Sequence, residues 1–147
     1  MGVPPVKPVI FAVSGQKNSG KTTLMTRLIA ELTERGWRVA TIKHDGHDFE
    51  PDVPGTDSFR HRTAGAYGSA VFSENRFLVT RTWDRGDERA LINLFPEADV
   101  ILLEGFKHSG YPKYVCRWPE EPLPSAAELA DEIERRMRDE GPVRTRD

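Results

Sequence analysis

The chain has 147 residues, of which 37% are hydrophobic and 30% charged, and this length predicts one domain with its own hydrophobic core. Its 21 basic and 23 acidic residues nearly balance, so no bulk electrostatic attraction to nucleic acid is expected. The single cysteine, Cys116, excludes an internal disulfide, and no run approaches the roughly 20 apolar residues of a membrane span. We therefore expect a cytoplasmic protein with local binding sites and neither nucleic acid nor membrane as a partner.

Residues 9–35 predict a strand, a glycine-containing loop and a helix in direct succession. The apolar run over residues 8–14 is typical of a strand buried on both faces of a parallel sheet. Residues 15–22, GQKNSGKT, match the phosphate-binding pattern G-x-x-x-x-G-K-[ST] at every fixed position. Leucines at four-residue spacing then predict a helix to about Arg35, with Gly36 as its left-handed C-cap. This order indicates a phosphate-binding loop (P-loop) of a nucleotide site.

The residue types of the loop suit the phosphates of a nucleoside triphosphate. Glycines let the backbone curl so that N–H groups point at phosphate oxygens, and the helix N-terminus adds partial positive charge. Lys21 is expected to reach the β- and γ-phosphates, and the Thr22 hydroxyl to bind Mg²⁺. The residues that we assign to nucleotide binding are Gly15, Lys17, Asn18, Ser19, Gly20, Lys21, Thr22 and Thr23.

A second strand is predicted over residues 37–43, followed by a polar loop over residues 44–55 and a short helix with Asp57 or Ser58 as its N-cap. The loop leaves the carboxyl end of a strand, where open α/β sheets place ligands. The densest polar cluster of the chain lies here: His44, Asp45, His47, Asp48, Asp57, Arg60, His61 and Arg62. Arginines suit a phosphate or another anion, and Asp45 suits a magnesium-bound water. A metal site made by the three histidines and a solvated loop without a role are the alternatives.

The following residues predict an added β-hairpin and a further buried strand. Strands are expected over residues 67–73 and 77–82, then a helix over residues 84–95 with Leu91, Ile92 and Phe95 facing the core. Residues 99–105 contain four consecutive aliphatic side chains and predict a buried parallel strand. A last strand over residues 114–118 and a helix with a capping box, Ser125 to Glu128, complete the domain over residues 9–140. Residues 1–8 are expected to be an extended lead-in and residues 141–147 a disordered tail.

Glu104 ends the buried strand and is the candidate for a second group on the metal side. A carboxylate at this position can hold Mg²⁺ or its water across from Thr22. Gly105 indicates close approach of the backbone to a ligand, and Lys107 follows on the same rim. Asp99, at the other end of the strand, is expected to be a turn residue. The candidate catalytic residues are Lys21, Asp45 and Glu104, and the candidate metal ligands are Thr22, Asp45 and Glu104.

Four segments together resemble the MobB family, the adaptor GTPases of molybdenum cofactor biosynthesis. They are residues 15–22, 41–47, 52–66 and 104–107. The resemblance implies a three-layer α/β P-loop NTPase with a mostly parallel central sheet, which binds GTP and Mg²⁺, hydrolyses GTP weakly and is usually a homodimer. It further implies assistance to the partner enzyme that joins GMP to molybdopterin, with molybdopterin or its molybdenum form facing residues 44–62.

The chain departs from the pattern of related proteins in two places. Lys17 occupies the third loop position, whereas related dimeric NTPases place an extra lysine at the second. The part after Arg117 looks short, although this region is expected to help hold the guanine base. A P-loop kinase for a small molecule is the alternative of another class, with Arg81, Arg85 and Arg89 as a possible water-excluding lid. Nucleotide binding without fast turnover would favour the adaptor.

Overall fold

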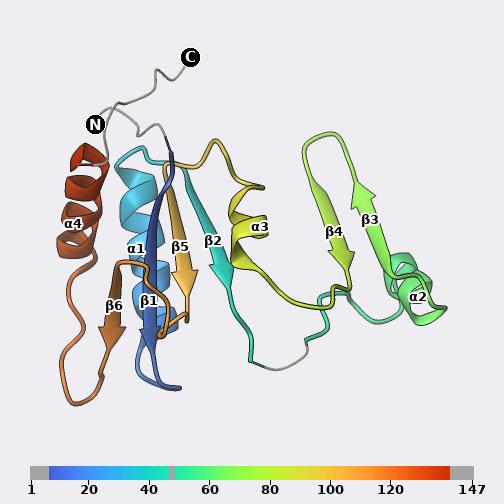
Figure 1. Ribbon diagram of the computed structural model, residues 1–147, viewed down its shortest axis with the longest axis horizontal. Helices are drawn as coiled ribbons and strands as arrows, with labels where there is room; N and C mark the ends of the chain where they lie inside the picture. The colour runs from blue at the N-terminus through green and yellow to red at the C-terminus, as the bar shows by residue number, and fades with distance from the viewer. Residues whose placement is uncertain (1–6, 47–48, 140–147) are drawn as a thin grey trace. The chain divides into compact units, whose positions relative to one another are not determined.

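The structure is a computed structural model that describes residues 7–46 and 49–139 (Figure 1). The chain forms two compact units, Met1–His44 with Glu88–Asp147, and Asp45–Asp87, and each is described by itself. Most of the predicted lead-in and the predicted tail lie outside the described residues, as do His47 and Asp48. Within the described ranges, no helix has the length and apolar character that crossing a membrane requires.

A four-stranded parallel sheet forms the centre of the first unit. The strands lie in the order β2 (Val39–Lys43), β5 (Val100–Glu104), β1 (Val9–Gly15) and β6 (Lys113–Cys116). All neighbouring strands are parallel, so their carboxyl ends share one edge of the sheet. Val13 pairs with Glu104, which confirms that the Glu104 strand lies beside the strand of the P-loop. The sheet therefore brings both predicted landmarks to the same edge.

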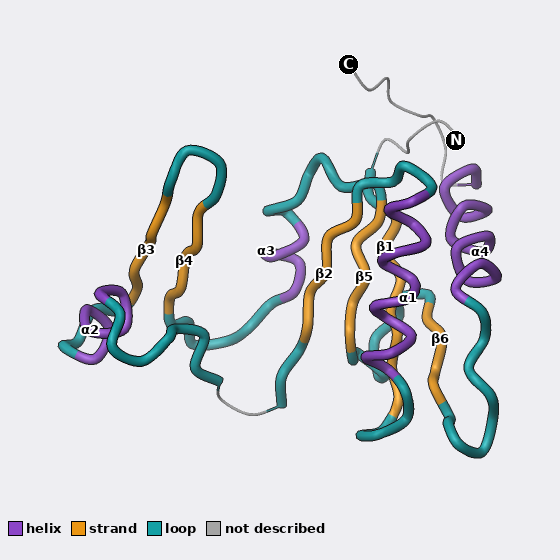
Figure 2. Tube along the Cα trace, turned by 180° about the vertical axis from the view of Figure 1, so that it is seen from behind, coloured by secondary structure: helices purple, strands orange, loops and turns teal. Residues whose placement is uncertain are grey.

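Helices cover both faces of this sheet and make the three layers that the sequence predicts (Figure 2). Alternate residues of β1 point to opposite faces, with Phe11 in one hydrophobic cluster and Ala12 in the other. The first cluster includes α1 (Lys21–Glu34) and α4 (Ala126–Asp139). These two helices are also joined by Arg35, whose guanidinium pairs with Asp131 and Glu134 at 2.8 and 2.9 Å. The opposite face is covered by α3 (Glu88–Ile92).

Two local features differ from what the sequence indicates: the length of α3 and the burial of Asp99. The helix expected over residues 84–95 is only Glu88–Ile92, because the chain before it bends at Asp84 and Arg85 and then contains Gly86, a poor helix former. Phe95 consequently lies beyond the helix and is 37% exposed. Asp99, predicted to be a turn residue, does lie in a bend just before β5, but it is fully buried, and its Oδ2 accepts a hydrogen bond from the backbone N–H of Arg38 at 2.6 Å. This carboxylate ties the start of β5 to the residue before β2.

The second unit contains α2 (Asp57–Thr63) and an antiparallel hairpin of β3 (Gly68–Phe72) and β4 (Phe77–Arg81). The hairpin turn is closed by a hydrogen bond from the Ser73 N–H to the Arg76 carbonyl, as the sequence predicts. The N-cap of α2 is Thr56, not Asp57 or Ser58, and its hydroxyl accepts from the Phe59 N–H. The strands carry exposed apolar side chains on both faces: Val71, Phe72, Phe77, Leu78 and Val79. The hairpin thus presents apolar surface that this unit does not cover.

Candidate functional site

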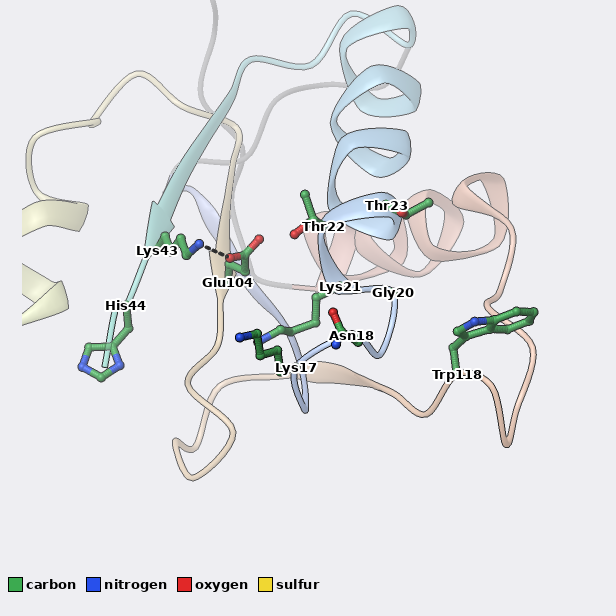
Figure 3. A pocket seen from close by; sticks show the side chains of 10 residues that line it. All are labelled: Lys17, Asn18, Gly20, Lys21, Thr22, Thr23, Lys43, His44, Glu104 and Trp118. Atoms are coloured by element: carbon green, nitrogen blue, oxygen red, sulfur yellow. Dashed lines mark ion pairs between the residues drawn. The ribbon is translucent and has the colours of Figure 1, made fainter. Parts of the chain in front are cut away.

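A cavity of about 560 Å³ lies at the carboxyl edge of the four-stranded sheet (Figure 3). This volume falls within the roughly 300–1,000 Å³ range of small-molecule sites. The cavity is lined by Lys17, Asn18, Gly20, Lys21, Thr22, Thr23, Lys43, His44, Glu104 and Trp118. The fold therefore brings the P-loop and the Glu104 carboxylate at the end of β5 to one site.

The P-loop has a backbone that only certain residues can adopt. Gly20 has a φ of 90° and Asn18 a φ of 63°, in the left-handed region that favours glycine and asparagine. A Cβ atom on Gly20 would lie 2.9 Å from Cδ1 of Leu123, and one on Gly15 would lie 2.8 Å from the Cys116 carbonyl oxygen. Both glycines therefore permit close packing of the loop, Gly15 against Cys116 at the end of β6 and Gly20 against Leu123 in the segment that follows.

The N-terminus of α1 suits an anion. Its N-cap residue, Gly20, makes no side-chain capping hydrogen bond, and the first turn contains no acidic residue. The first N–H groups of a helix need partners outside the helix, and phosphate oxygens are suitable acceptors. The buried Ser19 hydroxyl also has no hydrogen-bond partner among the residues that the structure describes. Unsatisfied polar groups of this kind need an explanation, and a bound phosphate next to the loop supplies one.

Thr22 and Glu104 form the side of the cavity that fits Mg²⁺. Figure 3 shows the two side chains projecting toward one another, and the Glu104 side chain is 12% exposed. Hydroxyl and carboxylate oxygens are ligands that Mg²⁺ accepts, and this ion typically completes its shell with water and substrate phosphates. The residues described contain no group of three or more His, Cys, Asp or Glu side chains placed to hold a metal. The alternative three-histidine site includes His47, which lies outside the described residues.

The chain after Glu104 is held in a defined conformation. The Gly105 N–H donates to the Val13 carbonyl at 2.9 Å. The ammonium of Lys113 donates to the carbonyl oxygens of Phe106, Lys107 and Ser109 at 3.0, 3.1 and 2.7 Å. Gly105 and Lys107 thus lie in a fixed loop that adjoins the cavity but does not line it.

Two lining residues, Lys43 and Trp118, were not among the site residues that we assigned from the sequence. Lys43 ends β2 and its Nζ lies 3.3 Å from Oε2 of Glu104. Trp118 follows β6 and its side chain is half exposed. Each lies at or just beyond the carboxyl end of a strand, so the rule that ligands bind at this edge was the available signal.

The Cys116 thiol beside the P-loop is a packing group. It is buried in the hydrophobic cluster that contains α1 and α4. Burial raises the pKa of Cys116, although the nearby charge of Lys21 lowers it. The thiol therefore stays protonated near neutral pH and is a poor nucleophile.

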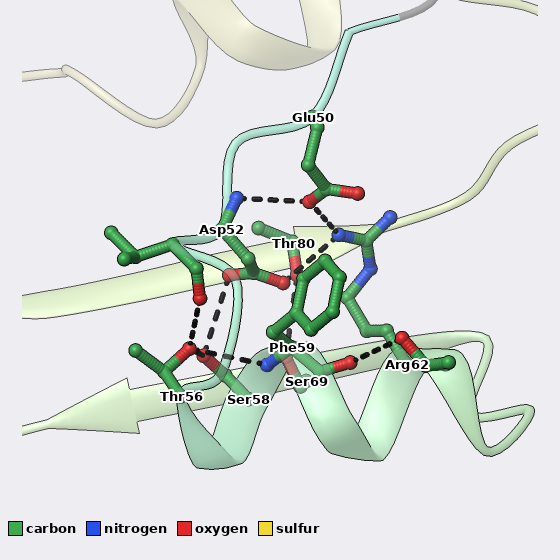
Figure 4. A network of polar contacts seen from close by, with 10 residues as sticks. Glu50, Asp52, Thr56, Ser58, Phe59, Arg62, Ser69 and Thr80 are labelled. Atoms are coloured by element: carbon green, nitrogen blue, oxygen red, sulfur yellow. Dashed lines mark hydrogen bonds and ion pairs between the residues drawn. The ribbon is translucent and has the colours of Figure 1, made fainter.

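The remaining predicted site residues belong to the second unit: Asp45, Asp57, Arg60, His61 and Arg62. Asp57, Arg60 and His61 are exposed on α2 at the spacing of a shared helix face. Arg62 differs, because its Nη1 atom lies 2.9 Å from Asp52 and 2.8 Å from Glu50 (Figure 4). Hydrogen bonds to these two carboxylates, first to Asp52, raise the pKa of Arg62 above its ordinary value. Arg62 therefore stabilises this unit, whereas the other three side chains face solvent.

Comparison with known proteins identifies the family. The family model of MobB, molybdopterin guanine dinucleotide synthesis protein B, matches residues 10–131. The chain belongs to the MobB family. The match includes the P-loop, the whole second unit and most of the first unit, and it ends within α4, so the resemblance seen in the sequence is confirmed.

Curated MobB relatives extend this similarity. The chain is 39% identical over 120 residues to a probable molybdopterin-guanine dinucleotide biosynthesis adapter protein of Bacillus subtilis, covering 78% of this chain and 68% of the relative. It is 40% identical over 111 residues to the Escherichia coli adapter protein, covering 72% of this chain and 63% of that relative. The chain thus spans about two thirds of the length of these curated relatives.

Solved MobB structures share the fold. The crystal structure of Bacillus subtilis MobB aligns with a TM-score of 0.64 and 30% identity, covering 95% of this chain and 76% of that one. A MobB homolog from Bacillus stearothermophilus aligns with a TM-score of 0.60 and 25% identity, covering 88% and 96%. The three-layer P-loop NTPase fold predicted from the sequence is therefore confirmed.

Proposed function

We propose that this MobB protein is a GTP-binding adaptor that assists the attachment of GMP to molybdopterin. The observation that carries the proposal is one cavity that combines the uncapped N-terminus of α1, Lys21, Thr22 and Glu104. Its support comes from the family and from relatives that are named adapter proteins of molybdopterin-guanine dinucleotide biosynthesis.

Within the proposal, the residues of the first unit bind a triphosphate. The N–H groups at the start of α1 and the Lys21 ammonium contact phosphate oxygens, as in other P-loop sites. Thr22 and Glu104 hold Mg²⁺, which neutralises phosphate charge when bound. Glu104 also suits the orientation of a water near the terminal phosphate, and we propose that hydrolysis is slow. Asp45 is the proposed partner of a magnesium-bound water.

The second unit supplies the proposed site for molybdopterin or its molybdenum form. Asp57, Arg60 and His61 form an exposed face of α2 that combines an anion-binding side chain with hydrogen-bonding groups. Such a face suits the phosphate and the ring amide of a pterin. The P-loop already offers donors to the nucleotide phosphates, so these side chains are available for a second ligand or for the partner enzyme.

We also propose a homodimer that involves the hairpin of the second unit. A lone two-stranded hairpin is marginally stable in water, and its unpaired edges are sites for pairing with another chain. Apolar side chains on both faces, among them Val71 and Val79, are more than half exposed. A second copy of the chain that covers this surface would remove it from water.

A reconstituted reaction tests the proposal. Purified protein is mixed with labelled GTP, Mg²⁺, molybdopterin and the GMP-transferring enzyme, and formation of the dinucleotide cofactor is followed with and without this protein. We expect more cofactor with the protein present, GTP turnover that is slow on the timescale of binding, and no displacement of GTP by ATP at equal concentration. Equal displacement by ATP, together with fast phosphate transfer to a metabolite, would instead identify a small-molecule kinase.

A further inference from the structure

We propose that Trp118 is the stacking surface for the purine base of the bound nucleotide. The inference rests on the proposed function, which places a nucleotide in the P-loop cavity. It states which end of that cavity holds the base. Among the described residues that line the cavity, Trp118 is the one large apolar side chain.

The chemistry of the cavity changes from one end to the other in the order found along a nucleotide. Figure 3 shows Lys43 and Glu104 on one side, the P-loop with Lys21 in the middle, and Trp118 beyond Gly20 on the other side. A nucleoside triphosphate bound with its terminal phosphate and Mg²⁺ near Glu104 has its remaining phosphates along the P-loop. Its base then lies at the end where Trp118 offers an aromatic face.

The position of Trp118 is fixed by contacts on both sides of it in the chain. Cys116 pairs with Gly15, so Trp118 comes two residues after the point at which β1 becomes the P-loop. Further along, Leu123 packs against Gly20 at the start of α1. Between them, the Glu121 N–H donates to the Arg117 carbonyl at 2.9 Å and closes a turn. The segment that carries Trp118 is therefore anchored to the P-loop at both ends.

The exposure of Trp118 distinguishes it from a structural tryptophan. Trp37 is buried in the core and its Nε1 donates to Glu134 at 2.7 Å. Trp118 is 51% exposed, so a large aromatic surface faces the cavity and water. Stacking of a flat base on this surface contributes favourably to the free energy of binding, and such stacking depends little on which base is present. Trp118 therefore contributes to affinity for any purine nucleotide, and it does not select GTP over ATP.

Calorimetry with two ligands tests the assignment. Trp118→Ala should weaken binding of GTP with Mg²⁺ by about tenfold, within the range for loss of one stacked base, and should weaken ATP by the same factor. Inorganic tripolyphosphate has no base, so its affinity should stay within about twofold, a small free-energy change. Trp118→Phe should retain most of the GTP affinity because it keeps an aromatic face. Lys21→Ala should weaken both ligands, so a failure of the phosphate site is distinguishable from a failure of the base site.

Fluorescence of the unaltered Trp118 provides a second measurement if Trp118→Ala perturbs folding. In Trp83→Phe protein, which retains Trp118 and the buried Trp37, GTP should quench the emission of the exposed indole and tripolyphosphate should not. GTP affinity unchanged in Trp118→Ala, or equal loss of GTP and tripolyphosphate affinity in a folded variant, would overturn the proposal. Quenching by both ligands to the same extent would also overturn it.

Discussion

The ammonium of Lys43 lies 3.3 Å from the carboxylate of Glu104, and the two residues are register partners at the ends of β2 and β5. In the proposed site, Lys43 is therefore a positive charge that would compete with Mg²⁺ for the same carboxylate. The Lys43 side chain is 65% exposed, and an exposed pair of this kind is worth about 0.2–1 kcal/mol. We predict that Lys43→Ala lowers the Mg²⁺ concentration needed for half-maximal GTP binding by about two- to fivefold. Glu104→Gln should raise that concentration, and both changes can be measured by magnesium titration at fixed GTP. A higher magnesium requirement in Lys43→Ala would show that Lys43 binds phosphate rather than restraining Glu104.

The packing of Leu123 against Gly20 predicts a strong effect of adding one methyl group to the P-loop. Gly20→Ala places a Cβ atom 2.9 Å from Leu123 and forces alanine to a φ of 90°. We expect a loss of about 1–3 kcal/mol in the free energy of unfolding, measured by urea denaturation. Adding Leu123→Ala to Gly20→Ala should remove the destabilisation caused by the steric contact, but not the destabilisation caused by the backbone conformation of alanine. If the double variant were as stable as Leu123→Ala alone, the backbone conformation would make no contribution to the loss.

Arg60 and Arg62 should behave differently although they are two residues apart. Arg60→Ala removes an exposed side chain and should leave GTP affinity within about threefold, while it impairs dinucleotide cofactor formation. Arg62→Ala leaves the Asp52 carboxylate, which is 2% exposed, without its guanidinium partner, and should lower the melting temperature. Calorimetry, the reconstituted reaction and thermal unfolding separate the two effects. Abolished GTP binding in Arg60→Ala, with cofactor formation spared at saturating GTP, would assign this segment to the nucleotide site.

The exposed hairpin predicts a dimer that one lysine can disrupt. Leu78 and Val79 are adjacent in β4 and point to opposite faces of the hairpin. If a second copy covers one face, Leu78→Lys or Val79→Lys should convert the dimer to a monomer, whereas Arg76→Ala at the turn should not. Light scattering after size-exclusion chromatography measures this at micromolar protein. A wild-type monomer, both with and without GTP and Mg²⁺, would contradict the homodimer.

The features predicted correctly from the sequence are those with a local signature. The P-loop has fixed residues, and the strand that ends at Glu104 has a continuous aliphatic run that is typical of a buried parallel strand. The length of α3 was overestimated because apolar spacing continued to Phe95, while the bend at Asp84 and Arg85 and the following Gly86 delay the start of the helix to Glu88.

The remaining features depend on contacts between residues that are distant in sequence. The sequence predicted Asp99 as a turn residue but not its burial, which accompanies a hydrogen bond from Arg38, 61 residues away. The pairing of Arg62 with Glu50 and Asp52 depends on an irregular loop with no periodic pattern. For Lys43 and Trp118 the sequence offered only their places near the carboxyl ends of predicted strands, and the strand order β2-β5-β1-β6 was needed to place both at the P-loop cavity.

Binding of GTP at the P-loop cavity is the central claim, and calorimetric titration of Lys21→Ala tests it most directly. Wild-type protein and the control Lys7→Ala, an exposed lysine before β1, should bind GTP with Mg²⁺ equally well. Lys21→Ala should lose at least about tenfold in affinity, or about 1.4 kcal/mol, because a charge-assisted phosphate contact is removed. Thr22→Ala should weaken binding only when Mg²⁺ is present, since its hydroxyl acts through the metal. Unchanged GTP affinity in a folded Lys21→Ala protein would contradict the placement of the nucleotide in this cavity.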